Sequence, residues 1–170
     1  MPNLRRRIEA LETSRSEHSE ALRTISEKAL NWLLRHDVEC LISAYAASRV
    51  GRPLTECEVA ATRAYAEALE RQCRGAGLPS TTGSSGLPLD LYHAFVRAFR
   101  LCKEETQLCL SGLLAAEQGR APNERESAAI QALNSEMQRV SRLAGFGSAA
   151  ECEVFCPSGT ARSVLIPFGF

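Results

Sequence analysis

The chain contains an internal repeat, and this repeat constrains the fold more than any other feature of the sequence. Residues 42–72 align without a gap with residues 110–140, a shift of 68 positions, and ten of the 31 aligned pairs are identical. Two segments with one pattern predict two copies of one structural unit. The identical pairs are Ser43/Ser111, Ala47/Ala115, Gly51/Gly119, Arg52/Arg120, Glu56/Glu124, Glu58/Glu126, Ala60/Ala128, Ala61/Ala129, Ala64/Ala132 and Arg71/Arg139.

Each copy has the pattern of a helical hairpin. A long helical stretch stops at Gly51 or Gly119, where a residue without a β carbon adopts a left-handed C-terminal cap most easily. A capping box follows within a few residues, starting at Thr55 in the first copy and at Asn123 in the second. Because two helices joined by so short a turn pack antiparallel, each copy is predicted to be a hairpin.

The fold class that follows is all-α, a four-helix bundle made of two duplicated antiparallel hairpins. The first helix of each hairpin is expected to be long, over about 19–50 and 89–118, and to be central, because its apolar residues cover nearly two faces. In the tail, strand-like runs on both sides of residues 157–160 predict a short β-hairpin. The expected segments are an N-terminal helical arm (1–18), hairpin 1 (19–74), a linker rich in glycine, serine and proline (75–88), hairpin 2 (89–144) and a C-terminal tail (145–170).

The charge balance argues against nucleic acid and membrane partners. The chain has 170 residues, with 20 basic and 20 acidic side chains and a formal net charge of zero. Its one basic run, residues 5–7, is followed closely by Glu9 and Glu12, which is typical of a solvated helix start. Apolar runs fall well short of the roughly 20 residues of a membrane span, and the N-terminus lacks the apolar core of a signal peptide. We therefore expect a cytoplasmic protein.

The seven cysteines favour reduced thiols over a disulfide framework. Their number is odd, they are widely spaced, and most lie within helical patterns. Such cysteines are typically small core residues of an intracellular protein. We expect no cofactor.

A short motif near the C-terminus offers an enzymatic alternative. Cys156 and Arg162 have the Cys-x5-Arg spacing, followed by a serine, and resemble the phosphate loop of cysteine-dependent phosphatases. The resemblance implies a nucleophilic Cys156 thiolate and an Arg162 that binds phosphate oxygens. It covers eight residues, and Phe155 stands where the family has a histidine. An ordinary turn in the tail hairpin explains the same residues.

Metal or ligand binding by the helical bundle is the other alternative. His36 and Cys40 lie four residues apart and would share one face of a helix. Asp90 and His93 are three apart, but the chain has no Cys-x2-Cys pair and no duplicated Glu-x-x-His motif. The repeat also does not carry His36 or Cys40 into its second copy. Buried thiols and partly exposed histidines explain these pairs without a metal.

The main functional hypothesis is a non-catalytic interaction or scaffold protein. An amphipathic N-terminal arm and an apolar tail are the kinds of segment that bind a neighbouring chain by groove filling or strand addition. The partner is expected to be a second copy of the chain, giving a homo-oligomer, or another protein. The residues expected to bind it are Val164, Leu165, Ile166, Phe168 and Phe170.

Overall fold

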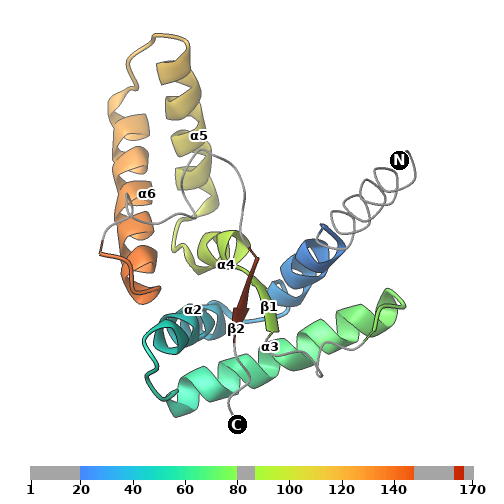
Figure 1. Ribbon diagram of the computed structural model, residues 1–170. Coiled ribbons are helices and arrows are strands. Elements are labelled where there is room, and N and C mark those ends of the chain that lie inside the picture. The colour runs from blue at the N-terminus through green and yellow to red at the C-terminus, as the bar shows by residue number, and fades with distance from the viewer. Residues whose placement is uncertain (1–19, 80–86, 148–162, 167–170) are drawn as a thin grey trace, which may run out of the picture.

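The computed structural model describes residues 20–79, 87–147 and 163–166, and this part of the chain is mostly helical, as predicted (Figure 1). Within it, no helix has both the length and the apolar character needed to cross a membrane. A helix over residues 20–30 comes first. It is followed by α2 (Arg35–Arg49), α3 (Glu56–Gly75), β1 (Leu87–Asp90), α4 (Leu91–Ala98), α5 (Lys103–Glu117), α6 (Glu124–Leu143) and β2 (Ser163–Ile166).

The helix bounds recur with the period of the sequence repeat. Moving α2 by 68 positions gives the bounds of α5, from 35 to 103 and from 49 to 117. The same shift converts α3 into α6, from 56 to 124 and from 75 to 143. Left-handed glycines after α3 and α6, Gly77 and Gly145, are also 68 residues apart. The structural similarity therefore extends beyond residues 72 and 140, where the aligned segments end.

The turn of hairpin 1 follows from its glycine. Gly51 has φ +67°, and the next residue, Arg52, donates its N–H to the carbonyl of Ala47 at 2.9 Å. This Schellman geometry satisfies a helix-end carbonyl that would otherwise lack a partner. In hairpin 2, Gly119 has φ +75° and Arg120 donates to Ala115 at 2.9 Å. The predicted glycine stops are confirmed.

A buried glutamate completes the start of the second helix in each hairpin. Glu58, 3% exposed, accepts the N–H of Thr55 at 2.8 Å, the hydroxyl of Ser43 at 2.6 Å and Arg52 Nη2 at 2.6 Å. Burial alone would raise the pKa of Glu58, but these donors, with Arg52 foremost among them, lower it to about 2. The carboxylate is therefore charged at neutral pH and binds the turn to both helices.

Glu126 has the same environment in hairpin 2 and is also 3% exposed. Its pKa is lowered to about 2, first by the hydrogen bond from Arg120 and then by those from Asn123 and Ser111. Both predicted capping boxes are confirmed.

These carboxylates make stability depend on pH. Their pKa values are lower in the folded chain than the ordinary value of 4.5, so the stabilisation is complete above about pH 4.5 and is lost as pH falls toward about 2. We expect the free energy of unfolding, measured with denaturant across this range, to drop steadily. The variants Glu58→Gln and Glu126→Gln should be less stable at neutral pH and should show a shallower drop. A variant with the wild-type slope would contradict this assignment.

The two long first helices predicted over 19–50 and 89–118 are wrong, because each is interrupted. The first breaks at residues 31–34, where Trp32 and Leu33 make i to i−3 hydrogen bonds and Leu34 is extended. The break changes the direction of the chain, so that apolar residues before and after it pack into one core. A straight helix would place its two apolar faces on opposite sides. The second breaks at 99–102, where Cys102 forms a capping box with Glu105 and starts α5.

The predicted linker and tail also need correction. Leu87 and Pro88, assigned to the linker, begin β1, all four residues of which are buried. β1 pairs antiparallel with β2, with Leu87 opposite Ile166 and Asp90 opposite Ser163. The expected first strand of the tail hairpin, near 151–156, lies outside the described residues. Within them, the partner of β2 is a segment more than 70 residues earlier, which no local turn signal could indicate.

Side chains from two helices support β1 in the core. Tyr65 donates its hydroxyl proton to the carbonyl of Pro88 at 2.6 Å, and Asp90 donates its N–H to Ser26 Oγ at 2.8 Å. The two hydroxyl oxygens are themselves 2.7 Å apart. This network satisfies buried polar groups that would otherwise be costly. The largest fully buried side chains are Tyr65, Phe95, Leu30, Leu41, Ile42, Leu69, Leu87, Leu89, Leu91, Val38 and Val140.

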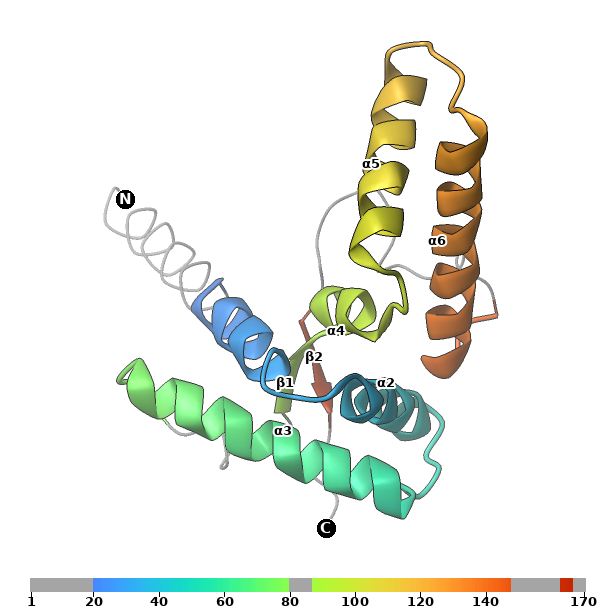
Figure 2. The ribbon, with the colours of Figure 1, turned by 180° about the vertical axis from the view of Figure 1, so that it is seen from behind.

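The two hairpins do not form one bundle. In Figures 1 and 2, α5 and α6 lie side by side and stand away from the layer that contains α2 and α3. α2 packs on α3, α4 and the end of α6, whereas the main neighbour of α5 in the described chain is α6. Arg139 ties α6 to the body, with bonds to Glu39 at 3.0 Å and to the carbonyl of Ala98 at 2.7 Å. The predicted four-helix bundle is therefore not confirmed.

Close packing between α5 and α6 depends on Gly112. A β carbon there would lie 3.0 Å from both the Glu126 β carbon and Ile130 Cδ1. We expect Gly112→Ala to lower the free energy of unfolding by about 1–3 kcal/mol through overpacking. Gly75→Ala is the matched control, because a β carbon at Gly75 would have nothing within 4 Å and alanine favours the helix. Equal effects of the two substitutions on thermal unfolding would exclude the packing explanation.

Candidate functional site

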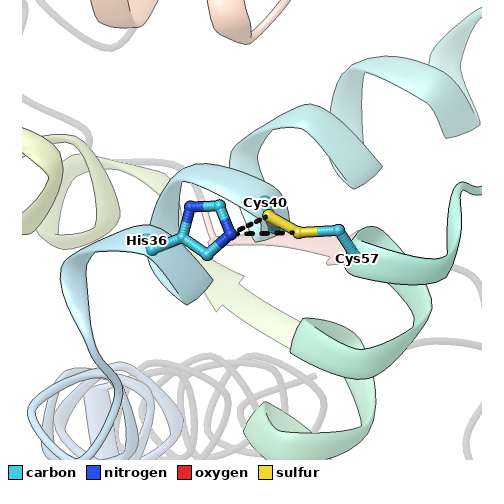
Figure 3. Close-up of side chains that lie close together, drawn as sticks. All are labelled: His36, Cys40 and Cys57. Carbon is cyan, nitrogen blue, oxygen red and sulfur yellow. Dashed lines mark hydrogen bonds between the residues drawn. A yellow bond between two sulfur atoms is a disulfide. The ribbon is translucent and has the colours of Figure 1, made fainter.

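His36, Cys40 and Cys57 come together where α2 and α3 begin (Figure 3). His36 and Cys40 lie one turn apart on α2, and Cys57 is the second residue of α3. His36 Nε2 is 3.7 Å from Cys40 Sγ and 3.5 Å from Cys57 Sγ. All three donor atoms lie within 4.8 Å of one another. The helical spacing in the sequence pairs His36 with Cys40 and does not indicate Cys57.

Cys40 and Cys57 form a disulfide, so the expectation that all cysteines are reduced is wrong for this pair. Their Cα atoms are 6.3 Å apart and they are 17 residues apart in sequence. The turn of the hairpin brings them together, because it places the first turn of α3, with Cys57, against Cys40 on α2. Cys73 and Cys109 are free and buried, as expected, and burial raises the pKa of both thiols.

Hairpin 2 carries different chemistry at the same place. The positions 68 residues after His36, Cys40 and Cys57 are Glu104, Leu108 and Arg125, and Arg125 Nη2 lies 2.6 Å from Glu104 Oε1. The two hairpins thus have the same arrangement of helices. In each, a side chain at the start of the first helix contacts a side chain at the start of the second. Sulfur and imidazole at this place are a property of hairpin 1 alone and are not needed to form the hairpin.

A hollow of about 520 Å³ opens beside the cluster. The carboxylates on its wall are already engaged. Glu58 holds the turn, and Glu39 accepts from Arg100 and Arg139 at 3.1 and 3.0 Å. The residues that line it are His36, Glu39, Cys40, Ser43, Arg52, Thr55, Glu58 and Leu143.

Asp90 and His93, a second pair considered from the sequence, are also in contact. His93 Nδ1 is 2.9 Å from Asp90 Oδ2, and the other oxygen of Asp90 accepts the N–H of His93 at 3.1 Å. Arg23 Nε lies 3.3 Å from Asp90 and Glu27 lies 3.4 Å from His93. Asp90 is 1% exposed. These contacts describe the N-terminal cap of α4, joined by ion pairs to the helix over residues 20–30, and they involve no nucleophile.

An apolar stripe is exposed on α5. Leu110, Leu113 and Leu114 are 57%, 45% and 55% exposed and follow the spacing of one helix face. The positions 68 residues earlier on α2 are Ile42, Tyr45 and Ala46. Ile42 is fully buried and Tyr45 packs against the core. The face that the body covers on α2 is therefore open on α5.

The remaining predicted residues are largely beyond the described part of the chain. Cys156 and Arg162, the phosphatase-like pair, lie outside it, as do Phe168 and Phe170. The backbone of residues 164–166 forms most of β2 and pairs with β1.

Comparison with known proteins adds no relative. No protein-family model matches the chain, and neither a curated protein nor a solved structure matches it.

Proposed function

We propose that this chain is a non-catalytic scaffold protein that self-associates, and that α5 of a second copy covers the exposed stripe of α5. The observation that carries the proposal is the set of three exposed leucines, Leu110, Leu113 and Leu114, on one helix face. Apolar side chains in such a row are typical of a helix that packs on another helix. With zero formal net charge, two copies meet little long-range repulsion.

Charges at the two ends of α5 favour a second copy as the partner. Lys103 lies seven residues before Leu110 and Glu117 lies seven residues after it. In an antiparallel pair of α5 helices centred on Leu110, Lys103 of each copy faces Glu117 of the other. Within the described chain neither charge has an ion-pair partner. Such a pairing is self-complementary, as a two-fold symmetric dimer requires.

The location of these charges within α5 supports the same arrangement. A lysine at the first position and a glutamate at the last are opposite to what the helix dipole favours. They gain nothing from their own helix, but each gains an opposite charge in the antiparallel pair.

The tail provides a further contact in this proposal. Val164, Leu165 and Ile166 lie in β2, whose strand partner in the described chain is β1. A strand from a neighbouring copy would pair with the other edge of β2. Phe168 and Phe170 would add apolar surface. Because β2 belongs to the folded body, deletion of the tail would disturb the core, and substitutions on α5 test self-association more cleanly.

The proposal also includes the origin and location of the chain. The two hairpins are inferred to be copies of one unit, since their helix bounds, glycine stops and buried glutamates recur 68 residues apart. We assign the protein to the cytoplasm on its composition. In that compartment glutathione would reduce the Cys40–Cys57 disulfide of this structure to two free thiols.

The first test is the mass of the protein in solution. We expect the full chain to sediment as a dimer and Leu110→Glu to sediment as a monomer, because the variant would bury two facing carboxylates. Val50→Glu is the control, since Val50 is 78% exposed but lies outside α5, and this variant should stay dimeric. Analytical ultracentrifugation over a concentration series measures both. A wild-type chain that stays monomeric at every concentration would overturn self-association. The exposed leucines of α5 would then be a binding surface for a different protein.

The second test distinguishes the antiparallel arrangement. Lys103→Glu or Glu117→Lys alone should raise the dimer Kd several-fold, because each exposed ion pair contributes about 0.2–1 kcal/mol and two pairs are lost. The double variant Lys103→Glu/Glu117→Lys restores opposite charges across the interface and should recover the wild-type Kd. Additive weakening in the double variant would exclude this geometry, which is specific to antiparallel pairing.

A further inference from the structure

We propose that His36, Cys40 and Cys57 bind one zinc ion when the two cysteines are reduced. Zinc binding goes beyond self-association and is independent of it. The observation behind it is the convergence of an imidazole and two sulfurs, donated by two helices, within 4.8 Å (Figure 3).

The distances suit a tetrahedral zinc site. Zinc bonds of about 2.3 Å to sulfur and 2.0–2.1 Å to imidazole nitrogen place nitrogen and sulfur about 3.6 Å apart. His36 Nε2 lies 3.7 Å from one sulfur and 3.5 Å from the other. Both sulfurs face the same ring nitrogen, and the second ring nitrogen points away from them (Figure 3). Once the disulfide is reduced, only the sulfurs must separate, and the exposed Cys57 side chain is able to turn.

The donor set selects zinc over the common hard cations. Two thiolates and one imidazole match a borderline-soft ion, whereas magnesium and calcium prefer oxygen ligands. Two thiolate charges also balance the charge of a divalent ion. Cys57 lies in the first turn of α3, where the positive end of the helix dipole favours a thiolate.

The fourth position of the site is open. Glu39 and Glu58 are the carboxylates on the adjoining hollow, and both are held by arginines. A water molecule or an external ligand from the hollow would therefore complete the tetrahedron, as in zinc sites with three protein ligands.

Hairpin 2 provides an internal comparison for this site. It forms the same helices with Glu104, Leu108 and Arg125 in place of the three donors. This arrangement of helices therefore does not need sulfur or imidazole, and metal binding is a use of these three donors that the fold of the hairpin does not require.

Zinc binding and the disulfide are alternative states of the same sulfurs. With hydrogen peroxide as the oxidant, each thiolate loses one electron and the S–S bond forms. The peroxide O–O bond accepts the two electrons and breaks to give two hydroxide ions, and zinc is released. A dithiol reductant reverses the change by taking the disulfide, which restores two thiols that lose their protons on binding zinc. The cluster thus couples metal occupancy to oxidation.

The test uses the full chain, reduced and freed of metal, titrated with Co²⁺ and then with Zn²⁺. We expect one equivalent of Co²⁺ to give thiolate charge-transfer absorption and tetrahedral d–d bands, and Zn²⁺ to abolish both. His36→Ala, Cys40→Ser and Cys57→Ser should each weaken binding by more than the roughly 10–100-fold lost when a group outside the ligand set is removed. Cys102→Ser is the matched control, because serine can replace the capping sulfur of Cys102 and binding should not change.

Two further measurements keep the proposal falsifiable. Far-ultraviolet circular dichroism checks the fold of each variant, and the exposed positions His36 and Cys57 can be substituted even if Cys40→Ser fails to fold. Peroxide should release the bound zinc, and dithiol should restore binding. A reduced wild-type chain without thiolate charge-transfer absorption, or one whose affinity is unchanged in His36→Ala and Cys57→Ser, would overturn the site.

Discussion

The fold depends on a charged carboxylate buried at the turn of each hairpin. Glu58 and Glu126 each accept a backbone N–H at the start of one helix, a serine hydroxyl from the other helix and an arginine from the turn. One side chain therefore fixes the cap, the turn and the register between two helices at once. A buried charge is tolerated because every bond that it needs is made within its own hairpin.

This self-contained frame allows the two hairpins to differ elsewhere. In hairpin 1, α2 is buried in the body and the helix starts carry sulfur and imidazole. In hairpin 2, α5 presents leucines to solvent and the helix starts carry an ion pair, Glu104 with Arg125. The repeated residues at the turns and caps determine how each hairpin folds, whereas the repeated Arg139 also joins hairpin 2 to the body. The proposed self-association and the proposed zinc site both rest on residues that the repeat does not share.

Signals local to a few residues could be predicted from the sequence, and signals between distant residues could not. The glycine stops and the two capping boxes follow from short patterns with one physical cause each. The break before α2 has no glycine or proline, and the break before α5 uses Cys102 in a role usually filled by serine. Strand pairing of β1 with β2 and the contact of Cys57 with His36 depend on tertiary packing, which helical periodicity does not encode. Gly77 and Gly145, beyond the aligned segments, are a local signal with the same period of 68 residues.

Arg139 joins one end of hairpin 2 to the rest of the structure. Its guanidinium joins α6 to Glu39 of α2 and to the end of α4, while Val140 and Ala144 enter the core beside it. The exposed leucines lie on the other helix of this hairpin, α5, away from the Arg139 contacts. A neighbour bound to α5 would therefore act on the body through the Arg139–Glu39 ion pair. Glu39 also borders the hollow beside His36. The residue that fixes the orientation of hairpin 2, Glu39, thus also lines the hollow next to His36 and Cys40.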